Sequence, residues 1–546
     1  MNLHHQFLAL LCLLIMGCQS DPAENEKTQG PAMVSSAHPL ATEAGLEILA
    51  KGGNAFDAAI AVASVLNVVE PMMSGMGGYG TILVYDAKTQ QVRYLDSSGK
   101  IPLNTNADMM RLPTPDYLEN RRGAKAVSTP GNVNAWAAMS AEYGNLEWAS
   151  LFDEAIRVSE EGFEVSPRLG IFIQRAFPEF SDYTKAFYGH DGEALKEGDL
   201  LVQADLANSF KQVASSGKGA FYQGSIGKAI HEKMMEKEGF LSSTDLENDK
   251  AEWWEPIKVD YKGYEVYTAS PPATAFPSLV RLGLMSQVEN LEHNSIDYLH
   301  SFAEVSKHAF WSRLKYAGDP EIAPPPLEML LSEAYWAGVM DTLVQTQARP
   351  FVPPGVEVES KNTTHFVVAD QWGNIVSATQ TLGNVFGSRI MAEGTGIWLN
   401  NSLAYCTYEP KGNPMDAIPG QRKLSGDCPT IIMKDGKPWA ALGTPGGHTI
   451  GQNVPQIVLN LLEFDMDMQK AIDAPKITFV EPNMIAVEDG ISDETYEALK
   501  SKGHEVSKGR VIGNAHGLQI LYDEQGKIKG YRGGADKRGE GLAKGN

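Results

Sequence analysis

The sequence predicts an α+β fold in which helices and antiparallel strands alternate along the chain. Residues 41–51 have amphipathic helical spacing, and residues 55–69 form an alanine-rich, apolar helix that Asn54 can cap. Strand-like runs follow at 81–85 and 91–95. With 546 residues, 43% of them hydrophobic, the chain can bury an extensive core.

The middle of the chain, residues 136–250, is predicted to be rich in helices, among them 225–237. A strand is predicted at 263–269, just before the breaker Pro271-Pro272. These alternating signals support the mixed class. They do not by themselves give the order of the layers.

A β hairpin is predicted around the turn Trp372-Gly373, with strand-like residues at 365–369 and 375–381. This hairpin brings Thr363 opposite Thr381. A threonine hydroxyl is a weak nucleophile unless a base stands beside it, and a cut before Thr363 would supply that base as the residue's own α-amino group. The alternative is a cross-strand Thr–Thr pair without chemistry.

A second predicted hairpin, 430–442, leads into the glycine-rich run 443–447, after which residues 450–462 have helical spacing. The glycines therefore stand at a strand-to-helix junction. Backbone N–H groups that converge at such a junction can form an oxyanion hole for acyl transfer. The alternative is a tight connection without function.

Six segments carry a family resemblance that covers the chain from about residue 32 to the C-terminus. They are Asn-Ala-Phe-Asp-Ala-Ala-Ile-Ala (54–61), Glu-Pro-Met-Met-Ser-Gly-Met-Gly-Gly-Tyr-Gly (70–80), Ser-Thr-Pro-Gly-Asn-Val (128–133), Thr-Thr-His-Phe (363–366), Leu-Ser-Gly-Asp-Cys-Pro-Thr (424–430) and Gly-Thr-Pro-Gly-Gly (443–447). Together they resemble the γ-glutamyltransferase (glutathione hydrolase) family of N-terminal-nucleophile hydrolases.

The resemblance implies a four-layer αββα sandwich built from a large fragment, 31–362, and a small catalytic fragment, 363–546, of one precursor cut between Asn362 and Thr363. Thr363 matches the autoprocessing and catalytic threonine, and Thr381 matches the threonine that positions it. Gly446 and Gly447 match the oxyanion pair. The implied substrates are γ-glutamyl amides such as glutathione, and neither a cofactor nor a metal is expected.

The residues that would hold the substrate's acyl head depart from the family pattern. Ser425 matches the first of two serines that hold the glutamyl α-carboxylate, but Gly426 replaces the second. Ser98 stands where members have an arginine for the same carboxylate, and Tyr405 stands where they have an aspartate for the α-ammonium. An asparagine of the family is Gly383 here. The chemical machinery is therefore kept while the recognition groups are altered.

Another cation is expected to replace the missing arginine. Arg422, three residues before Ser425, is the first choice, with Arg389 and Lys100 as further candidates, although Arg422 could also be a surface residue. The stretch 407–421 looks shorter than the family's lid. A more open pocket admits water and would favour hydrolysis over transfer to an acceptor amine.

The N-terminus predicts export as a lipoprotein. An apolar stretch, 7–17, is too short to span a bilayer and ends at Cys18 in a sequence resembling the bacterial lipobox. Residues 1–18 would be the signal peptide, Cys18 the lipidated residue and 19–30 a polar tether on the periplasmic side. An ordinary signal peptide or a wrongly assigned start codon is the alternative, since no Lys or Arg precedes the apolar stretch.

The formal charge of −22 and the pI near 5.0 argue against nucleic acid as a partner, because phosphate binding needs a concentrated basic face. The membrane is expected as a partner only through the lipid anchor. Cys406 and Cys428 remain in the mature chain, either as a disulfide or as two buried thiols. His365 is expected to be a hydrogen-bonded structural residue and not a general base.

Three functions are compatible with these observations. The first is a γ-glutamyl hydrolase of glutathione-like amides, and the second is an amidase acting on dicarboxylic acid monoamides that lack the α-amino acid head. The third is a non-catalytic lipoprotein scaffold, against which the retained Thr363, Thr381, Gly446 and Gly447 count.

Overall fold

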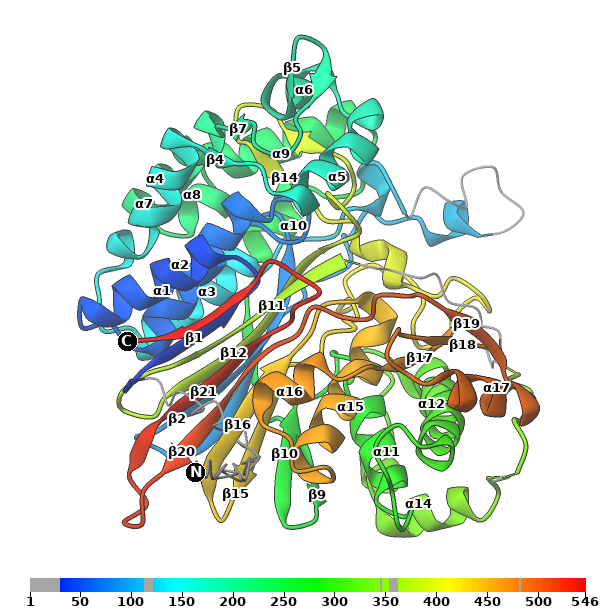
Figure 1. Cartoon of the computed structure of the whole chain (residues 1–546). Coiled ribbons are helices and arrows are strands. Elements are labelled where there is room, and N and C mark those ends of the chain that lie inside the picture. The colour runs from blue at the N-terminus through cyan, green and yellow to red at the C-terminus, as the bar shows by residue number, and fades with distance from the viewer. Residues whose placement is uncertain (1–29, 112–120, 344–345, 353–361, 481–482) are drawn as a thin grey trace, which may run out of the picture.

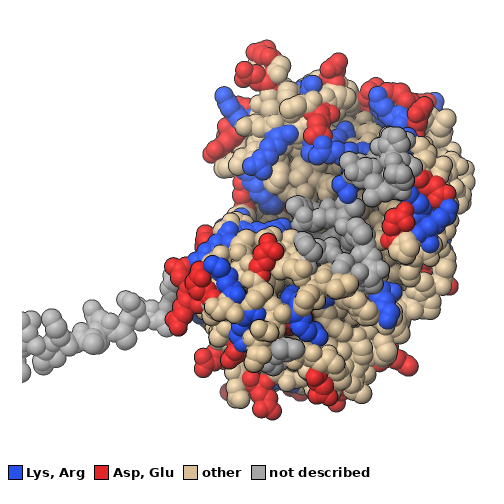
Figure 2. Space-filling view, turned by 90° about the vertical axis from the view of Figure 1, so that its right-hand side faces the viewer, with Lys and Arg blue, Asp and Glu red and all other residues tan. Residues whose placement is uncertain are grey.

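The computed structural model describes residues 30–111, 121–343, 346–352, 362–480 and 483–546, and shows two stacked sheets between layers of helices (Figure 1). The predicted signal peptide, the lipidation site Cys18 and residues 19–29 lie outside the described residues. Within the described ranges, no helix is both long and apolar enough to cross a membrane. Acidic and basic side chains are interspersed over the face seen in Figure 2.

The larger sheet has seven strands and contains the hairpin of Thr363. All of its neighbouring strands run antiparallel. In spatial order they are β22 (Leu542–Gly545), β1 (Met33–Ser36), β11 (Asn362–Ala369), β12 (Ile375–Gly383), β2 (Tyr79–Asp86), β3 (Gln91–Ser97) and β8 (Glu252–Trp254).

Helices cover the outer face of this sheet, as the family resemblance implied. The buried helix α2 (Ala55–Val69) packs on β11 and β12, and its first turn is closed by a capping box between Asn54 and Asp57. A helical lobe follows, at the top of Figure 1. The other helices of this side are α1 (Pro39–Ala50), α3 (Asn132–Tyr143), α4 (Asp153–Glu161), α5 (Pro167–Ala176), α6 (Asp182–Tyr188), α7 (Ala204–Ser216), α8 (Gly219–Tyr222), α9 (Ser225–Glu236) and α10 (Ser243–Asn248).

The second sheet has six strands, again all antiparallel. Their order is β21 (Ile528–Ala535), β20 (His516–Tyr522), β16 (Lys437–Gly443), β15 (Thr430–Lys434), β10 (Tyr264–Thr268) and β9 (Ile257–Tyr261). Helices on its outer side include α11 (Phe276–Met285), α12 (Ile296–Tyr316), α14 (Glu333–Met340), α15 (Ile450–Leu462) and α16 (Met468–Asp473).

The inner faces of the two sheets pack against each other. Leu83 and Val367 of the first sheet share a buried cluster with Ala441 of the second, and the Ser377 hydroxyl on β12 donates a hydrogen bond of 3.3 Å to the Leu442 carbonyl on β16. The predicted αββα sandwich is confirmed. Its hairpins end near one another, which brings the strand β11 and the glycine-rich run after β16 together.

Candidate active site

Thr363 lies at the start of β11, beside Thr381 on β12. The two strands pair regularly from Ala369 and Ile375 to Thr364 and Gln380, and an irregularity then shifts the register. Such a bulge re-aims the side chains next to it. Here it leaves the Thr363 hydroxyl oxygen 3.3 Å from that of Thr381, with both residues buried.

The Thr381 hydroxyl is the centre of a small hydrogen-bond network. It donates to the Asn362 carbonyl oxygen at 2.6 Å, and it accepts the Gly383 N–H at 2.8 Å and the Thr363 hydroxyl at 3.3 Å. One hydroxyl hydrogen and two lone pairs are thereby all used. Thr381 therefore fixes both the Thr363 hydroxyl and the carbonyl of the peptide bond immediately before it.

A cavity of about 210 Å³ opens at Thr363. Sequence analysis did not single out the two arginines on its wall, because both come from segments far away in the chain. Arg168 is held by an ion pair of 3.3 Å with the buried Glu70, which also accepts the Thr364 hydroxyl at 2.8 Å. The lining consists of Met73, Arg168, Asn362, Thr363, Pro445, Gly446, Thr449 and the loop residues Arg510, Val511, Ile512, Gly513 and Asn514.

The glycine pair stands at the predicted strand-to-helix junction, and Gly446 lines the same cavity as Thr363. Gly446 has a φ of 140° and Gly447 a φ of 58°, both in the region that favours glycine. A Cβ on Gly446 would lie 2.4 Å from the Thr449 hydroxyl oxygen. A short 3₁₀ turn and α15 begin here, and the first N–H groups of a helix have no partner inside it.

The residues predicted for the acyl head also gather near the glycine pair. The Ser425 hydroxyl oxygen accepts the Asp427 N–H at 3.2 Å. A Cβ on Gly426 would lie 3.6 Å from the Tyr405 ring and 3.8 Å from the Gly447 carbonyl oxygen. These residues therefore lie next to one another, with Gly426 adjacent to Gly447 of the glycine turn.

The Ser98 side chain is engaged in hydrogen bonds with Asp96. Its hydroxyl donates to Asp96 at 2.8 Å, and the Ser98 N–H donates to the same carboxylate at 3.2 Å. Tyr94 adds a third hydrogen bond of 2.9 Å to Asp96. Ser98 thus stabilises a buried carboxylate in this structure.

The expectation that Arg422 replaces the missing arginine is wrong. Its guanidinium donates to Glu252 through Nε at 2.9 Å and Nη2 at 2.7 Å, and it also pairs with Glu321 at 2.7 Å. The same group stacks over the Trp254 ring at 5.0 Å. These acidic partners, which are distant in sequence, turn the side chain away from the pocket of Ser425.

The cation beside the acyl-head residues is instead Lys423, which the sequence analysis missed. Its side chain is completely buried, with Nζ 3.1 Å from the centre of the Tyr79 ring and 5.5 Å from that of Tyr405. Burial lowers the pKa of Lys423 to about 7, and burial raises the pKa of the nearby Asp427 to about 6. The available signal was a pair of charges flanking the motif 424–426.

His365 and the two cysteines are buried in the protein interior. His365 Nδ1 lies 2.8 Å from the Thr379 hydroxyl oxygen, and complete burial holds its pKa well below the usual range. Cys406 and Cys428 are both buried free thiols, so the second of the two alternatives holds. The Cys428 thiol donates to the Ser278 hydroxyl at 3.2 Å.

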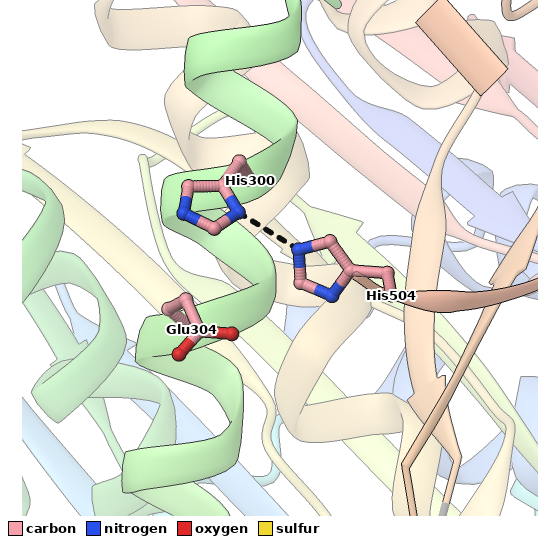
Figure 3. Close-up of side chains that lie close together, drawn as sticks. All are labelled: His300, Glu304 and His504. Atoms are coloured by element: carbon pink, nitrogen blue, oxygen red, sulfur yellow. Dashed lines mark hydrogen bonds between the residues drawn. The ribbon is translucent and has the colours of Figure 1, made fainter. Parts of the chain in front are cut away.

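One group among the described residues has the composition of a metal site. His300 and Glu304 project from α12 toward His504, and His300 Nδ1 lies 2.8 Å from His504 Nε2 (Figure 3). Glu304, however, already accepts Lys307 at 2.8 Å and Arg349 at 3.2 Å. A divalent ion would face both of these cations, so we assign the cluster a role in packing.

Two stacked antiparallel sheets between helical layers, with a threonine at a strand start facing a glycine turn, define the class of N-terminal-nucleophile hydrolases. The family model for gamma-glutamyltranspeptidase matches residues 41–545, and the chain belongs to this family. It is accordingly an enzyme of the gamma-glutamyltransferase type.

The proteins similar to this chain include some named glutathione hydrolase and others named acylase. A glutathione hydrolase proenzyme of Bacillus subtilis (strain 168) is 34% identical, over 94% of this chain and 91% of that protein. An acylase ACY 1 proenzyme of Pseudomonas sp. (strain V22) is 32% identical, over 94% of this chain and 93% of that protein. The crystal structure of cephalosporin acylase from Bacillus halodurans matches with a TM-score of 0.87 and 28% sequence identity. The match covers 98% of this chain and 99% of that chain.

Proposed function

We propose that this protein is an autoprocessing amide hydrolase that cleaves γ-glutamyl amides of the glutathione type through an acyl-threonine intermediate. The observation that carries the proposal is the network in which Thr381 holds both the Thr363 hydroxyl and the Asn362 carbonyl, in the wall of a cavity shared with Gly446. Nucleophile, electrophile and positioning group are already together in the uncut chain.

In the maturation step, the Thr363 hydroxyl oxygen attacks the Asn362 carbonyl carbon. The hydrogen bond of 2.6 Å from Thr381 stabilises the negative charge that develops on the carbonyl oxygen. As the C–N bond breaks, the leaving nitrogen of Thr363 takes up the hydroxyl proton, which gives an ester and a free Thr363 amine. Water then hydrolyses the ester, which restores the Thr363 hydroxyl and leaves a carboxylate at Asn362. The products are a large fragment that ends at Asn362 and the small fragment 363–546, which stay packed in one fold.

In turnover, the freed amine takes the proton of the Thr363 hydroxyl, whose oxygen attacks the substrate's amide carbonyl. The N–H groups of Gly446 and Gly447 stabilise the oxyanion, a contribution of roughly 3 kcal/mol per donor. The protonated amine then gives its proton to the leaving amine. Water, activated by the same amine, hydrolyses the acyl ester, and a short lid at 407–421 favours this outcome over transfer to another amine.

An acylase acting on dicarboxylic acid monoamides is the second candidate. Two observations favour it: Ser98 and Tyr405 carry no charge, and the relatives include proteins named acylase. The γ-glutamyl hydrolase is preferred because a cation and a carboxylate, Lys423 and Asp427, are both two residues from Ser425 and buried.

Hydrolysis of γ-glutamyl and glutaryl p-nitroanilides by the purified protein tests this proposal, with Thr363→Ala as the inactive control. We expect a strong γ-glutamyl preference that the variant abolishes. Equal or faster turnover of the glutaryl compound would establish the second candidate, and equal background rates in both proteins would contradict enzymatic function at Thr363.

Attachment to a membrane through a lipidated Cys18 is also a proposal. It rests on the lipobox-like sequence at 14–18 and the polar stretch that follows. Metabolic labelling with a radioactive fatty acid tests it, because Cys18→Ser should lose the label and release the protein from membranes.

A further inference from the structure

Lys423 is a buried cation without a counter-ion in contact. Its Nζ makes no hydrogen bond, and within the described part of the chain no carboxylate lies within ion-pair distance of it. Lys233 on α9 shows the ordinary arrangement, since its Nζ lies 2.7 Å from both Glu236 and Glu393. An unpaired buried ammonium is costly, so its retention here points to a partner that is absent from the free protein.

Lys423 is also close to the reacting groups. Tyr79, whose ring contacts Nζ, lies directly opposite Thr381 in the antiparallel pairing of β2 and β12. Opposed residues have their Cβ atoms about 5 Å apart on the same face of a sheet. Thr381 in turn contacts Thr363. The ammonium is therefore one side chain away from the pair that holds the nucleophile.

Asp427 supplies a complementary charge on the same wall. Its carboxylate accepts a long hydrogen bond of 3.4 Å from the Thr81 hydroxyl, whose residue lies two positions after Tyr79 on the same face of β2, and it also interacts with the Ser425 hydroxyl. The third charge nearby, Asp96, already accepts three hydrogen bonds from Tyr94 and Ser98. Lys423 thus makes no hydrogen bond, and Asp427 is bound by the protein through fewer short hydrogen bonds than Asp96.

A ligand that satisfies both must carry a negative and a positive group close together. A lone carboxylate would neutralise Lys423 but would add a third negative charge beside Asp427 and Asp96, which is unfavourable in a buried site. An α-amino acid head carries a carboxylate and an ammonium on one carbon. It offers a charge-assisted hydrogen bond to each member of the pair.

We propose that Lys423 and Asp427 are the specificity-determining pair of the acyl subsite, with Lys423 binding the α-carboxylate and Asp427 the α-ammonium of a γ-glutamyl group. This inference rests on the proposed function and names the residues that select its substrate. Lys423 Nζ lies 3.1 Å from the centre of the Tyr79 ring and 5.5 Å from that of Tyr405, and the Tyr405 ring also borders Gly426, so a ligand that reaches Gly426 comes close to the ammonium.

Steady-state kinetics of Lys423→Met and Asp427→Asn, with Lys233→Met as a matched buried-lysine control, tests the pair. We expect Lys423→Met to raise KM for γ-glutamyl p-nitroanilide by at least about 30-fold while kcat falls less than about fivefold, since a charge-assisted contact made before the chemical step is lost. Asp427→Asn should lower the preference for γ-glutamyl over glutaryl by at least about tenfold. Lys233→Met should change neither value.

A binding measurement separates this inference from the proposed function. Free L-glutamate should raise the Tm of the wild-type protein and of Lys233→Met, glutarate should raise it less, and Lys423→Met should lose the L-glutamate shift. If that pattern holds in a wild-type protein that hydrolyses neither anilide, the pair is established and the proposed hydrolysis fails. If γ-glutamyl p-nitroanilide is hydrolysed with an unchanged KM in Lys423→Met, the pair is refuted and the hydrolysis stands.

Discussion

The hairpin of Thr363 and the surroundings of Lys423 meet at the paired residues Thr381 and Tyr79, yet they satisfy their polar groups in opposite ways. In the hairpin, the Thr381 hydroxyl uses its hydrogen and both lone pairs on Asn362, Thr363 and Gly383. In the pocket, Lys423 contacts aromatic rings and makes no hydrogen bond. One region is complete without a ligand, whereas the other is not.

This difference separates the two tasks of the site. The hairpin must react with its own chain before any substrate arrives, so its groups have to be positioned by the fold alone. The pocket acts only when substrate binds, and the charges that it keeps buried lower the stability of the free protein. The following experiments test or sharpen this contrast, from the largest expected effect to the smallest.

Replacing Thr381 by Val should have the largest effect on the hairpin. Removing the hydroxyl leaves the Asn362 carbonyl without its donor, and loss of one such donor lowers rates by about 10²–10³-fold. Gel analysis over time should show uncut chain long after the wild type is processed. Thr381→Ser, which keeps the hydroxyl, should process at a rate within about tenfold of the wild type; equal processing by the Val variant would remove Thr381 from the mechanism.

Gly446→Ala should lower kcat by about 10²-fold, because a Cβ on this residue at a φ of 140° would collide with Thr449 and displace an oxyanion donor. Gly436→Ala is the matched control. Gly436 also has a positive φ, 74°, in the turn between β15 and β16, with open space around its Cβ position. Similar losses of kcat in both variants would indicate general destabilisation and not a role for Gly446.

The pocket predicts a pH dependence of substrate binding. Burial lowers the pKa of Lys423 to about 7, so the ammonium is charged below this pH and is lost as the pH rises through it. We expect kcat/KM for a γ-glutamyl substrate to fall about tenfold per pH unit above that value. Lys423→Arg, which stays charged, should move this limb to higher pH. If the fall of kcat/KM stays at the same pH in Lys423→Arg, the titrating group is a residue other than Lys423.

Arg422→Ala should affect stability and leave binding nearly unchanged. The buried guanidinium holds Glu252 and Glu321, and because these partners are partly exposed its loss should lower the free energy of unfolding by about 1–3 kcal/mol. KM should change less than about twofold. Chemical denaturation and kinetics on one preparation check both values. A large rise in KM would show that Arg422 contributes to substrate binding after all.

The sequence predicted the parts of the site that depend on local patterns. The hairpin strands, the glycine junction and α15 follow from alternation, turn residues and helical spacing, and the structure confirms them. The choice of cation failed because Arg422 and Lys423 are neighbours on an irregular segment that turns them in opposite directions. That direction depends on Glu252 on β8 and Tyr79 on β2, which are remote in sequence. Arg168 and Arg510 were missed for the same reason.

The most direct measurement is the intact mass of the purified protein beside its Thr363→Ala variant. The account predicts two fragments that meet at Asn362 and Thr363 in the wild type, and one uncut chain in the variant. A single uncut chain in both would contradict it, because the terminal amine on which the proposed turnover depends would never form.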